Sequence, residues 1–168
     1  MNESKLILVL GDQLSLNQPA LKQAEPGRDI ILLAEVAEEA SYVRHNRHKI
    51  ALLFSAMRHF RLELEALGHT VHYVTIDQGV SSLEAAVRGV VEHSAVNEVI
   101  VCEPGEYRLL EQMRATWSSA LGVPVKILED ERFLASHEDF ELWARGKKQL
   151  RMEFFYRQMR QRYQLLMD

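Results

Sequence analysis

Residues that could bind a ligand directly follow three apolar runs of the sequence, at 6–10, 30–34 and 99–102. These residues are Gly11, Asp12, Gln13, Glu35 and Glu103. Glycine lets the backbone approach a ligand closely, and carboxylate and amide oxygens accept hydrogen bonds. The pattern predicts a site for a small molecule that carries N–H or hydroxyl donors rather than many phosphates. The alternative interpretation is an ordinary turn after the first run and a solvated carboxylate after the second.

Other patterns of reactive residues are weak in this sequence. No GxGxxG follows the first apolar run and no GxxxxGK[ST] occurs, so neither a dinucleotide site nor a P-loop is indicated. His45 and His48 are three residues apart, as are His69 and His72, but neither pair belongs to an HExxH pattern, and a zinc site is not favoured. Cys102 lies inside an apolar run and is expected to pack as a small hydrophobic side chain.

The elements that must position the polar residues alternate along the chain. Apolar runs typical of buried strands occur at 6–10, 30–34, 71–76, 99–102 and 123–128. Apolar residues recur every three or four positions, as in amphipathic helices, at 50–67, 83–91 and 107–121. The first link has two prolines and room only for a short helix near 20–24. This alternation predicts a parallel sheet with helices on both faces, and such sheets bind ligands beyond the carboxyl ends of their strands.

The C-terminal segment follows a different pattern. A helix with Ser136 as its N-cap is predicted at 136–143. A second helix, rich in arginine and aromatic residues, is predicted at 149–166. Residues 1–140 carry 13 basic and 21 acidic side chains, whereas residues 141–168 carry 7 and 3. A basic end is usually a solvated helix face, and less often a surface that meets another domain or a polyanion. Because the last helix shows no stop signal, we expect the natural chain to continue beyond Asp168.

Length and composition bound the class of protein. A chain of 168 residues that is 47% hydrophobic and 26% charged suits one globular domain, and excludes disorder and a disulfide-stapled miniprotein. The single cysteine cannot form an internal disulfide, which predicts a reducing, cytoplasmic setting. The N-terminus lacks a signal-peptide pattern, and no stretch reaches the roughly 18 apolar residues of a membrane span. A membrane protein is therefore not expected.

Four strings, in order along the chain, resemble those of a known family. They are LGDQLS (10–15), AEVAEEASYVRHNRHKIALLFSAMRHF (34–60), EPGEYRLLEQM (103–113) and LRMEFFYRQMR (150–160). The sequence is similar to the photolyase-related proteins of bacteria, the iron–sulfur group of the cryptochrome/photolyase family that includes prokaryotic (6-4) photolyases. The resemblance implies a Rossmann-like, open five-stranded parallel sheet in the order 3-2-1-4-5, with helices on both faces and C-terminal linker helices.

The resemblance also implies a division of labour. Residues 1–130 would form an α/β antenna-chromophore domain, and residues 131–168 a helical linker toward an FAD-binding helical domain that this chain lacks. FAD, a 4Fe-4S cluster and the surface for damaged DNA belong to that missing domain, and one cysteine cannot supply the four that a cluster needs. We expect no catalytic or metal-binding residue in this chain, which alone would be inactive, although its parent would be a DNA photolyase, a lyase.

The resemblance places an antenna chromophore, 6,7-dimethyl-8-ribityllumazine, near the carboxyl ends of the strands. The matching positions are Gly11, Asp12, Gln13, Glu35, Lys49, Ile50, Leu53 and, less closely, Glu103. Ile50 and Leu53 would form the apolar wall. Three alternatives stay open: an interaction module without chromophore, a photoreceptor rather than a repair protein, and a nucleotide-binding α/β protein, which the missing phosphate loop argues against.

Overall fold

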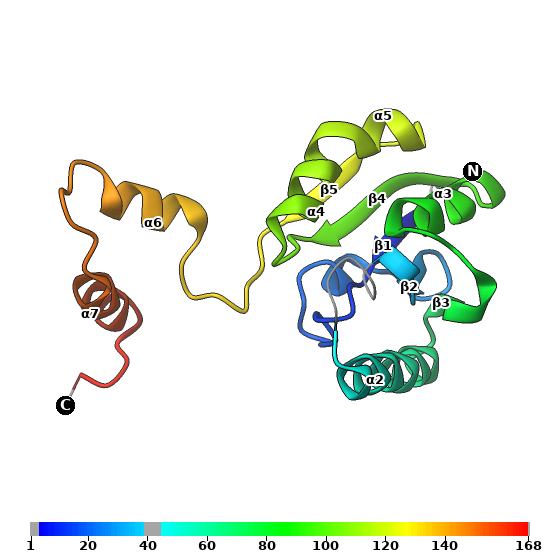
Figure 1. Cartoon of the computed structure of the whole chain (residues 1–168), viewed down its shortest axis with the longest axis horizontal. Coiled ribbons are helices and arrows are strands. Elements are labelled where there is room, and N and C mark those ends of the chain that lie inside the picture. Colours follow the sequence, from blue (N-terminus) through cyan, green and yellow to red (C-terminus); the bar gives the residue numbers. More distant parts are fainter. Residues whose placement is uncertain (1–3, 39–44, 168) are drawn as a thin grey trace. The chain divides into compact units, whose positions relative to one another are not determined.

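The computed structural model describes residues 4–38 and 45–167, and its chain divides into two compact units, 1–130 and 131–168. The first unit is built on a five-stranded sheet in which every strand pair is parallel (Figure 1). Its strands are β1 (Ser4–Leu8), β2 (Ile30–Ala34), β3 (Thr70–Val74), β4 (Val96–Cys102) and β5 (Val125–Leu128). Their order, β3-β2-β1-β4-β5, confirms the predicted α/β fold.

The central position of β1 follows from its sequence. Leu6 is paired with Ile30 of β2 on one side and with Val99 of β4 on the other. Leu6, Ile7 and Leu8 are fully buried, because a central parallel strand is covered on both faces. Successive side chains of a strand point to opposite faces, so β1 contributes to two separate cores.

One core lies between the sheet and α2 (Arg47–Ala66). Met57 and Phe60 of α2 pack there with Ile7 of β1, and the short helix η1 (Leu21–Gln23) closes the same core through Leu21. The expected short helix near 20–24 is thereby confirmed. Leu67, predicted to continue the apolar stripe of α2, is exposed because the helix has already ended at Ala66.

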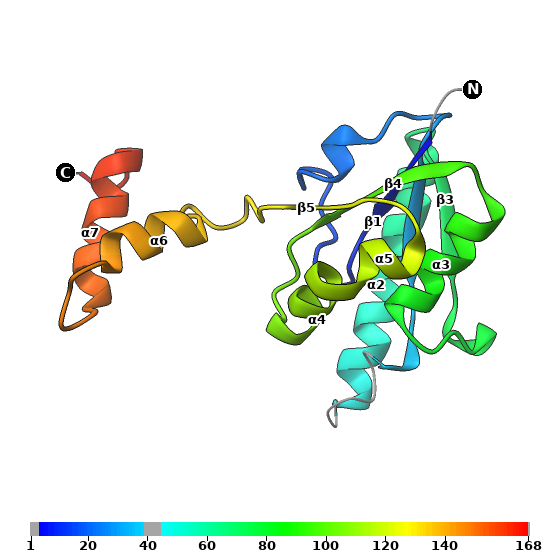
Figure 2. The same cartoon turned by 90° about the horizontal axis from the view of Figure 1, so that it is seen from above.

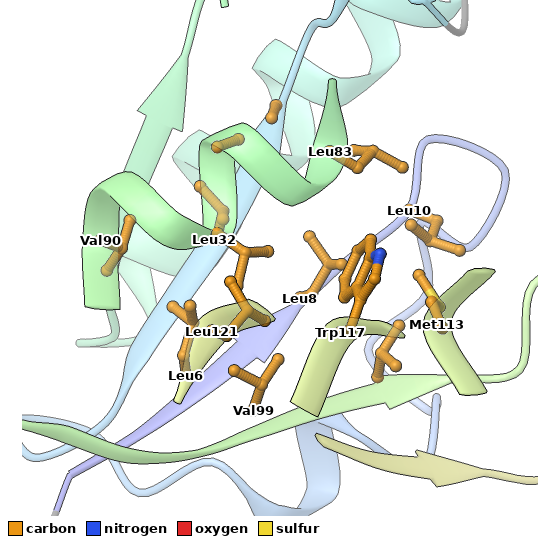
Figure 3. Packing of buried hydrophobic residues seen from close by; sticks show 14 of the residues in the cluster. Leu6, Leu8, Leu10, Leu32, Leu83, Val90, Val99, Met113, Trp117 and Leu121 are labelled. Atoms are coloured by element: carbon orange, nitrogen blue, oxygen red, sulfur yellow. The ribbon is translucent and has the colours of Figure 1, made fainter. Parts of the chain in front are cut away.

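The other core lies on the opposite face, beneath α3 (Leu83–His93) and a composite helix (Figure 2). That helix consists of α4 (Tyr107–Gln112), one π-helical turn (Met113–Trp117) and α5 (Ser118–Leu121). Trp117 is fully buried and lies among Leu8, Leu10 and Met113 (Figure 3). Tyr107, predicted to belong to this apolar stripe, is 74% exposed, and the buried stripe of α4 begins only at Leu109 and Leu110.

The cap of α3 differs from the prediction by one residue. The sequence suggests a reciprocal capping box between Ser81 and Glu84. In the structure, Ser82 is the cap, and its side-chain oxygen accepts a hydrogen bond from the Ala85 N–H at 3.1 Å. Glu84 instead forms an ion pair with Arg88, one turn further along the helix. The pairing at i,i+4 therefore takes the carboxylate that the capping box would have used.

The second unit is a pair of helices, α6 (His137–Ala144) and α7 (Met152–Tyr163). Ser136 and Asp139 cap α6 reciprocally, as a capping box does. The last helix predicted over 149–166 does form, but its bounds are narrower and the prediction that it lacks a stop is wrong. Gln164 adopts a left-handed conformation with φ 54°, and its N–H donates to carbonyls of the last turn, which ends α7 at Tyr163.

Candidate functional site

The loops after β1 and β4 are joined at the carboxyl edge of the sheet. Gln13 is 2% exposed, and its Nε2 donates hydrogen bonds to the carbonyl oxygens of Glu103 at 2.9 Å and Cys102 at 3.5 Å. A Cβ atom placed on Gly105 would lie 3.9 Å from the Asp12 carboxylate. The structure therefore brings together Asp12, Gln13 and Glu103, which the sequence separates by about 90 residues.

Gly11 lies directly beneath α2. A Cβ atom on Gly11 would be 3.1 Å from the Met57 sulfur and 3.4 Å from a methyl group of Leu53. Real Cβ contacts are rarely that short, so a larger residue at this position would require Met57 or Leu53 to shift. Leu53 is predicted as part of the apolar wall, and the structure places it at this loop; Met57 is predicted only as a core residue.

Buried acceptor groups accompany this loop. The Nε2 group of Gln13 donates to two carbonyls, which leaves Oε1 buried and without a hydrogen-bond partner among residues 4–38 and 45–167. Gln18, which donates from Nε2 to the Gln13 carbonyl at 3.1 Å, has an Oε1 in the same condition. A buried acceptor without a partner is costly, so either oxygen would gain from an N–H or O–H donor brought within hydrogen-bond distance.

Glu35 has a different environment from the one predicted. Its carboxylate is fully buried and is neither a solvated strand end nor a free acceptor. Arg58 of α2 donates to both oxygens, from Nε at 2.7 Å and from Nη2 at 2.9 Å. The Tyr73 hydroxyl donates to Oε1 at 2.6 Å, and the Ile76 N–H to Oε2 at 3.0 Å. Glu35 therefore joins the end of β2 to α2 and to the end of β3.

These contacts shift the ionisation of all three side chains. Burial works to raise the pKa of the Glu35 carboxyl, but the hydrogen bonds from Arg58, Tyr73 and Ile76 outweigh it and hold that pKa below its usual value. Burial and the hydrogen bond to Glu35 raise the pKa of the Tyr73 phenol. The hydrogen bonds to Glu35 likewise raise the pKa of Arg58. The network consequently holds a carboxylate, a guanidinium and a neutral phenol at neutral pH.

The remaining carboxylates at this edge are paired across loops. Arg108 donates to Glu38 at 2.8 Å and to Glu106 at 2.7 Å, so it links the segment after β2 to the loop after β4. Glu103 lies 3.5 Å from Arg114 of the composite helix. The carboxylates of Glu38, Glu103 and Glu106 are thus compensated by arginines of the composite helix.

The first turn of α2 carries the last two predicted site residues. Ile50 is half-buried and precedes Leu53 by three positions, which places both on one face of the helix. Lys49 is exposed in the same turn. Residues 39–44, which belong to the long family-like string and precede this turn, lie outside the described residues.

Neither a metal-binding cluster nor a membrane-spanning helix occurs in the described ranges, 4–38 and 45–167. No three His, Cys, Asp or Glu side chains there gather in a way that could hold a metal ion. None of the helices there has both the length and the apolar character that crossing a membrane requires.

Comparison with known proteins decides the family. The family model for deoxyribodipyrimidine photo-lyase-related proteins matches residues 7–168. The chain belongs to this photolyase-related family. It is 44% identical over 167 residues to a protein of Agrobacterium fabrum named (6-4) photolyase, and the match covers 98% of this chain. The photolyase-related chain spans only 33% of that relative's length.

Sequence reasoning missed four residues of this photolyase-related site. Met57, Arg58 and Tyr73 looked like core or surface residues of their own elements, and Gln18 like part of a turn. The one signal for Arg58 was its position near the end of the family-like string at 34–60, but nothing in that string indicated a buried partner for its guanidinium. Each contact depends on residues far apart in the sequence, so only the folded arrangement reveals it.

Proposed function

We propose that the first unit is the antenna-binding domain of a photolyase-related flavoprotein that acts in light-driven DNA repair. The observation that carries this proposal is the buried, unpartnered Oε1 of Gln13, beside the loop that Gly11 holds against Leu53. A site for a small aromatic molecule needs an apolar wall and a few fixed polar groups, and this edge of the sheet offers both.

The residues present fit 6,7-dimethyl-8-ribityllumazine. Its ring N–H and ribityl hydroxyls are the donors that Gln13 and Gln18 lack, and Leu53 and Ile50 suit its methyl groups. Asp12 and Lys49 are the sequence neighbours of Gln13 and Ile50, and the Glu103 carbonyl accepts a hydrogen bond from Gln13, so these three residues are proposed as further contacts. When bound, such a chromophore absorbs near-ultraviolet or blue light and passes the excitation to a reduced flavin.

The chemical step of repair is proposed to lie outside this chain. FAD, the 4Fe-4S cluster and the contacts with damaged DNA would belong to the two thirds of the relative's length that the chain does not span. A single cysteine cannot supply a four-cysteine cluster. The name of the relative favours repair over signalling, and the choice of lesion depends on those other residues.

A binding titration tests the antenna role. We expect the purified chain to bind 6,7-dimethyl-8-ribityllumazine with a dissociation constant in the micromolar range, followed by its fluorescence. Leu53→Trp should prevent binding by filling the wall, whereas Leu52→Trp, on the adjacent and 72% exposed position, should bind normally. An intact fold by circular dichroism with no binding at tens of micromolar would reject the antenna role and favour an interaction module without chromophore.

A second role rests on the surface of α6 and α7. Large apolar side chains are exposed in this small unit, namely Leu142, Leu150, Met152, Phe154 and Tyr156. Exposed apolar surface of this kind commonly marks a protein interface, and we propose the FAD-binding domain of the same protein as its partner. In the full-length protein, Phe154→Asp should accelerate proteolysis between the domains, whereas Leu62→Asp, at a similarly exposed position of α2, should not.

A further inference from the structure

The Glu35 carboxylate has protein partners for its full acceptor capacity. Each of its two oxygens receives two hydrogen bonds, at 2.6 and 2.7 Å on Oε1 and at 2.9 and 3.0 Å on Oε2. Two carboxylate oxygens offer about four lone-pair sites. A ligand that contacted this carboxylate would have to displace Arg58, Tyr73 or the Ile76 N–H. Gln13, whose Oε1 has no partner among the described residues, has the opposite character.

The donors come from separate elements of the fold. Tyr73 lies in β3 and Ile76 follows it, whereas Arg58 lies in the middle of α2. An ionised carboxylate in the interior is stable only while its hydrogen bonds are kept. Sliding or rotation of α2 would withdraw Arg58 and leave Glu35 with unpaired charge. The network therefore favours one position of α2 along and about its axis.

The neighbouring face of α2 meets the candidate ligand site. Met57 directly precedes Arg58, and Leu53 lies about one turn before Met57. Both side chains pack directly against Gly11, where a Cβ atom on the glycine would lie only 3.1 Å from the Met57 sulfur. A shift of α2 by a few tenths of an ångström would change the distance from this wall to the loop that carries Gln13.

We propose that Glu35, Arg58 and Tyr73 form a clamp that positions α2 over the Gly11–Gln13 loop, and that Glu35 affects chromophore binding only through this helix. Glu35 is then a positioning residue, not a ligand contact. The proposal rests on the antenna role proposed above. It replaces the sequence-based expectation that the Glu35 carboxylate itself binds the chromophore.

Lumazine titrations of Tyr73→Phe and Glu35→Gln separate positioning from contact, because the two hypotheses predict opposite signs. A clamp predicts that both variants weaken binding, by about two- to thirtyfold. The double variant should bind no more weakly than Glu35→Gln alone, since both act through one network. Direct contact predicts that Tyr73→Phe, which frees a lone pair of Glu35, binds as well as or better than the wild type.

Two readouts complete the test. The absorption maximum of bound lumazine should be the same in the wild type and Glu35→Gln, because Glu35 does not touch the ring; a shifted maximum would overturn the proposal. In the protein without lumazine, hydrogen exchange of residues 47–57 should accelerate in both variants relative to 83–93 of α3. Glu63→Gln removes an exposed carboxylate on the same helix and is the matched control that should change neither readout.

The outcomes distinguish the clamp from the antenna role. Wild-type protein that fails to bind lumazine refutes the antenna role, while the exchange of 47–57 still decides whether the clamp positions α2. Unchanged exchange in both variants refutes the clamp. Lower thermal stability with unchanged affinity also refutes it, because Glu35 would then be merely structural.

Discussion

Replacing Glu35 with glutamine measures how much the network between β2, α2 and β3 stabilises the fold. Glutamine keeps the shape of the side chain, but its NH2 group cannot accept hydrogen bonds from the donors that now face Oε1 or Oε2. Two of the four hydrogen bonds on Glu35 are therefore lost together with its charge. A hydrogen bond to a charged group contributes about 1.5–3 kcal/mol. Because the half-exposed Arg58 can return to water, the low end applies, and we expect a loss of about 3 kcal/mol.

Urea denaturation followed by tryptophan fluorescence measures this loss. The chain has two tryptophans, one in each unit, so a Trp143→Phe background leaves Trp117 as the reporter of the first unit. For a chain of this size, a loss of about 3 kcal/mol lowers the melting temperature by about 6–12 °C. Glu63→Gln, at an exposed position of the same helix, should cost less than about 0.5 kcal/mol.

The same variant has a defined pH dependence. The folded protein holds the pKa of Glu35 below its ordinary value of 4.5, so this carboxylate stabilises the fold above that pH. Its contribution disappears as the pH falls through the folded-state pKa. The difference in stability between wild type and Glu35→Gln should thus be full at pH 7 and shrink below about pH 4.5. A loss under about 1 kcal/mol at pH 7, or a difference that is the same at pH 7 and pH 3, would refute the reasoning.

Further substitutions test the contacts of Gly11, Asp29 and Trp117. Gly11→Ala should destabilise the protein by about 1–2 kcal/mol, because the Cβ of the new alanine would lie 3.1 Å from the Met57 sulfur. Adding Met57→Ala to this variant should relieve that clash. Unchanged stability of the Gly11→Ala protein would contradict the contact. Asp29→Asn should cost about 2 kcal/mol at pH 7, because this buried carboxylate accepts two backbone hydrogen bonds and one from Arg28. These contacts hold the pKa of Asp29 below 3.8, so the loss of stability should become smaller at lower pH. A loss that is independent of pH in urea titrations would contradict this role of Asp29. Trp117→Phe should cost about 1 kcal/mol and Trp117→Ala about 4 kcal/mol of stability. Only packing is lost in either variant, because the buried indole N–H has no hydrogen-bond partner among the described residues. Equal melting temperatures for the two variants would contradict this.

The fold could be predicted from local patterns because each pattern has a direct physical cause. The continuous apolar run at 6–10 requires cover on both faces, and β1 is the fully buried central strand. The predicted positions of the helices were also correct, since they depend on a three-to-four spacing of apolar residues. Their ends were less predictable: α7 ends just before Gln164, whose left-handed backbone is rare outside glycine and asparagine and has no sequence signal.

The candidate site was predicted only in part. Asp12, Gln13 and Glu103 do meet, because strands of a parallel sheet end at one edge, a consequence of topology that the sequence already implies. Whether each of these residues contacts a chromophore stays a prediction. Glu35 was grouped with them by its position alone, since every strand end looks alike in sequence.

The sequence by itself determined the fold class, the edge of the sheet at which polar residues gather, and the membership of a photolyase-related family. Only the tertiary structure decided whether Glu35 and Gln13 have hydrogen-bond acceptors left for a ligand. Glu35 receives donors from Arg58 and Tyr73, which lie 23 and 38 residues away, and so its acceptor capacity is used within the protein. Gln13 keeps a buried acceptor without a partner in the described residues. Residue type sets how many hydrogen bonds a side chain can form, but the packing of distant elements determines how many are left for a ligand.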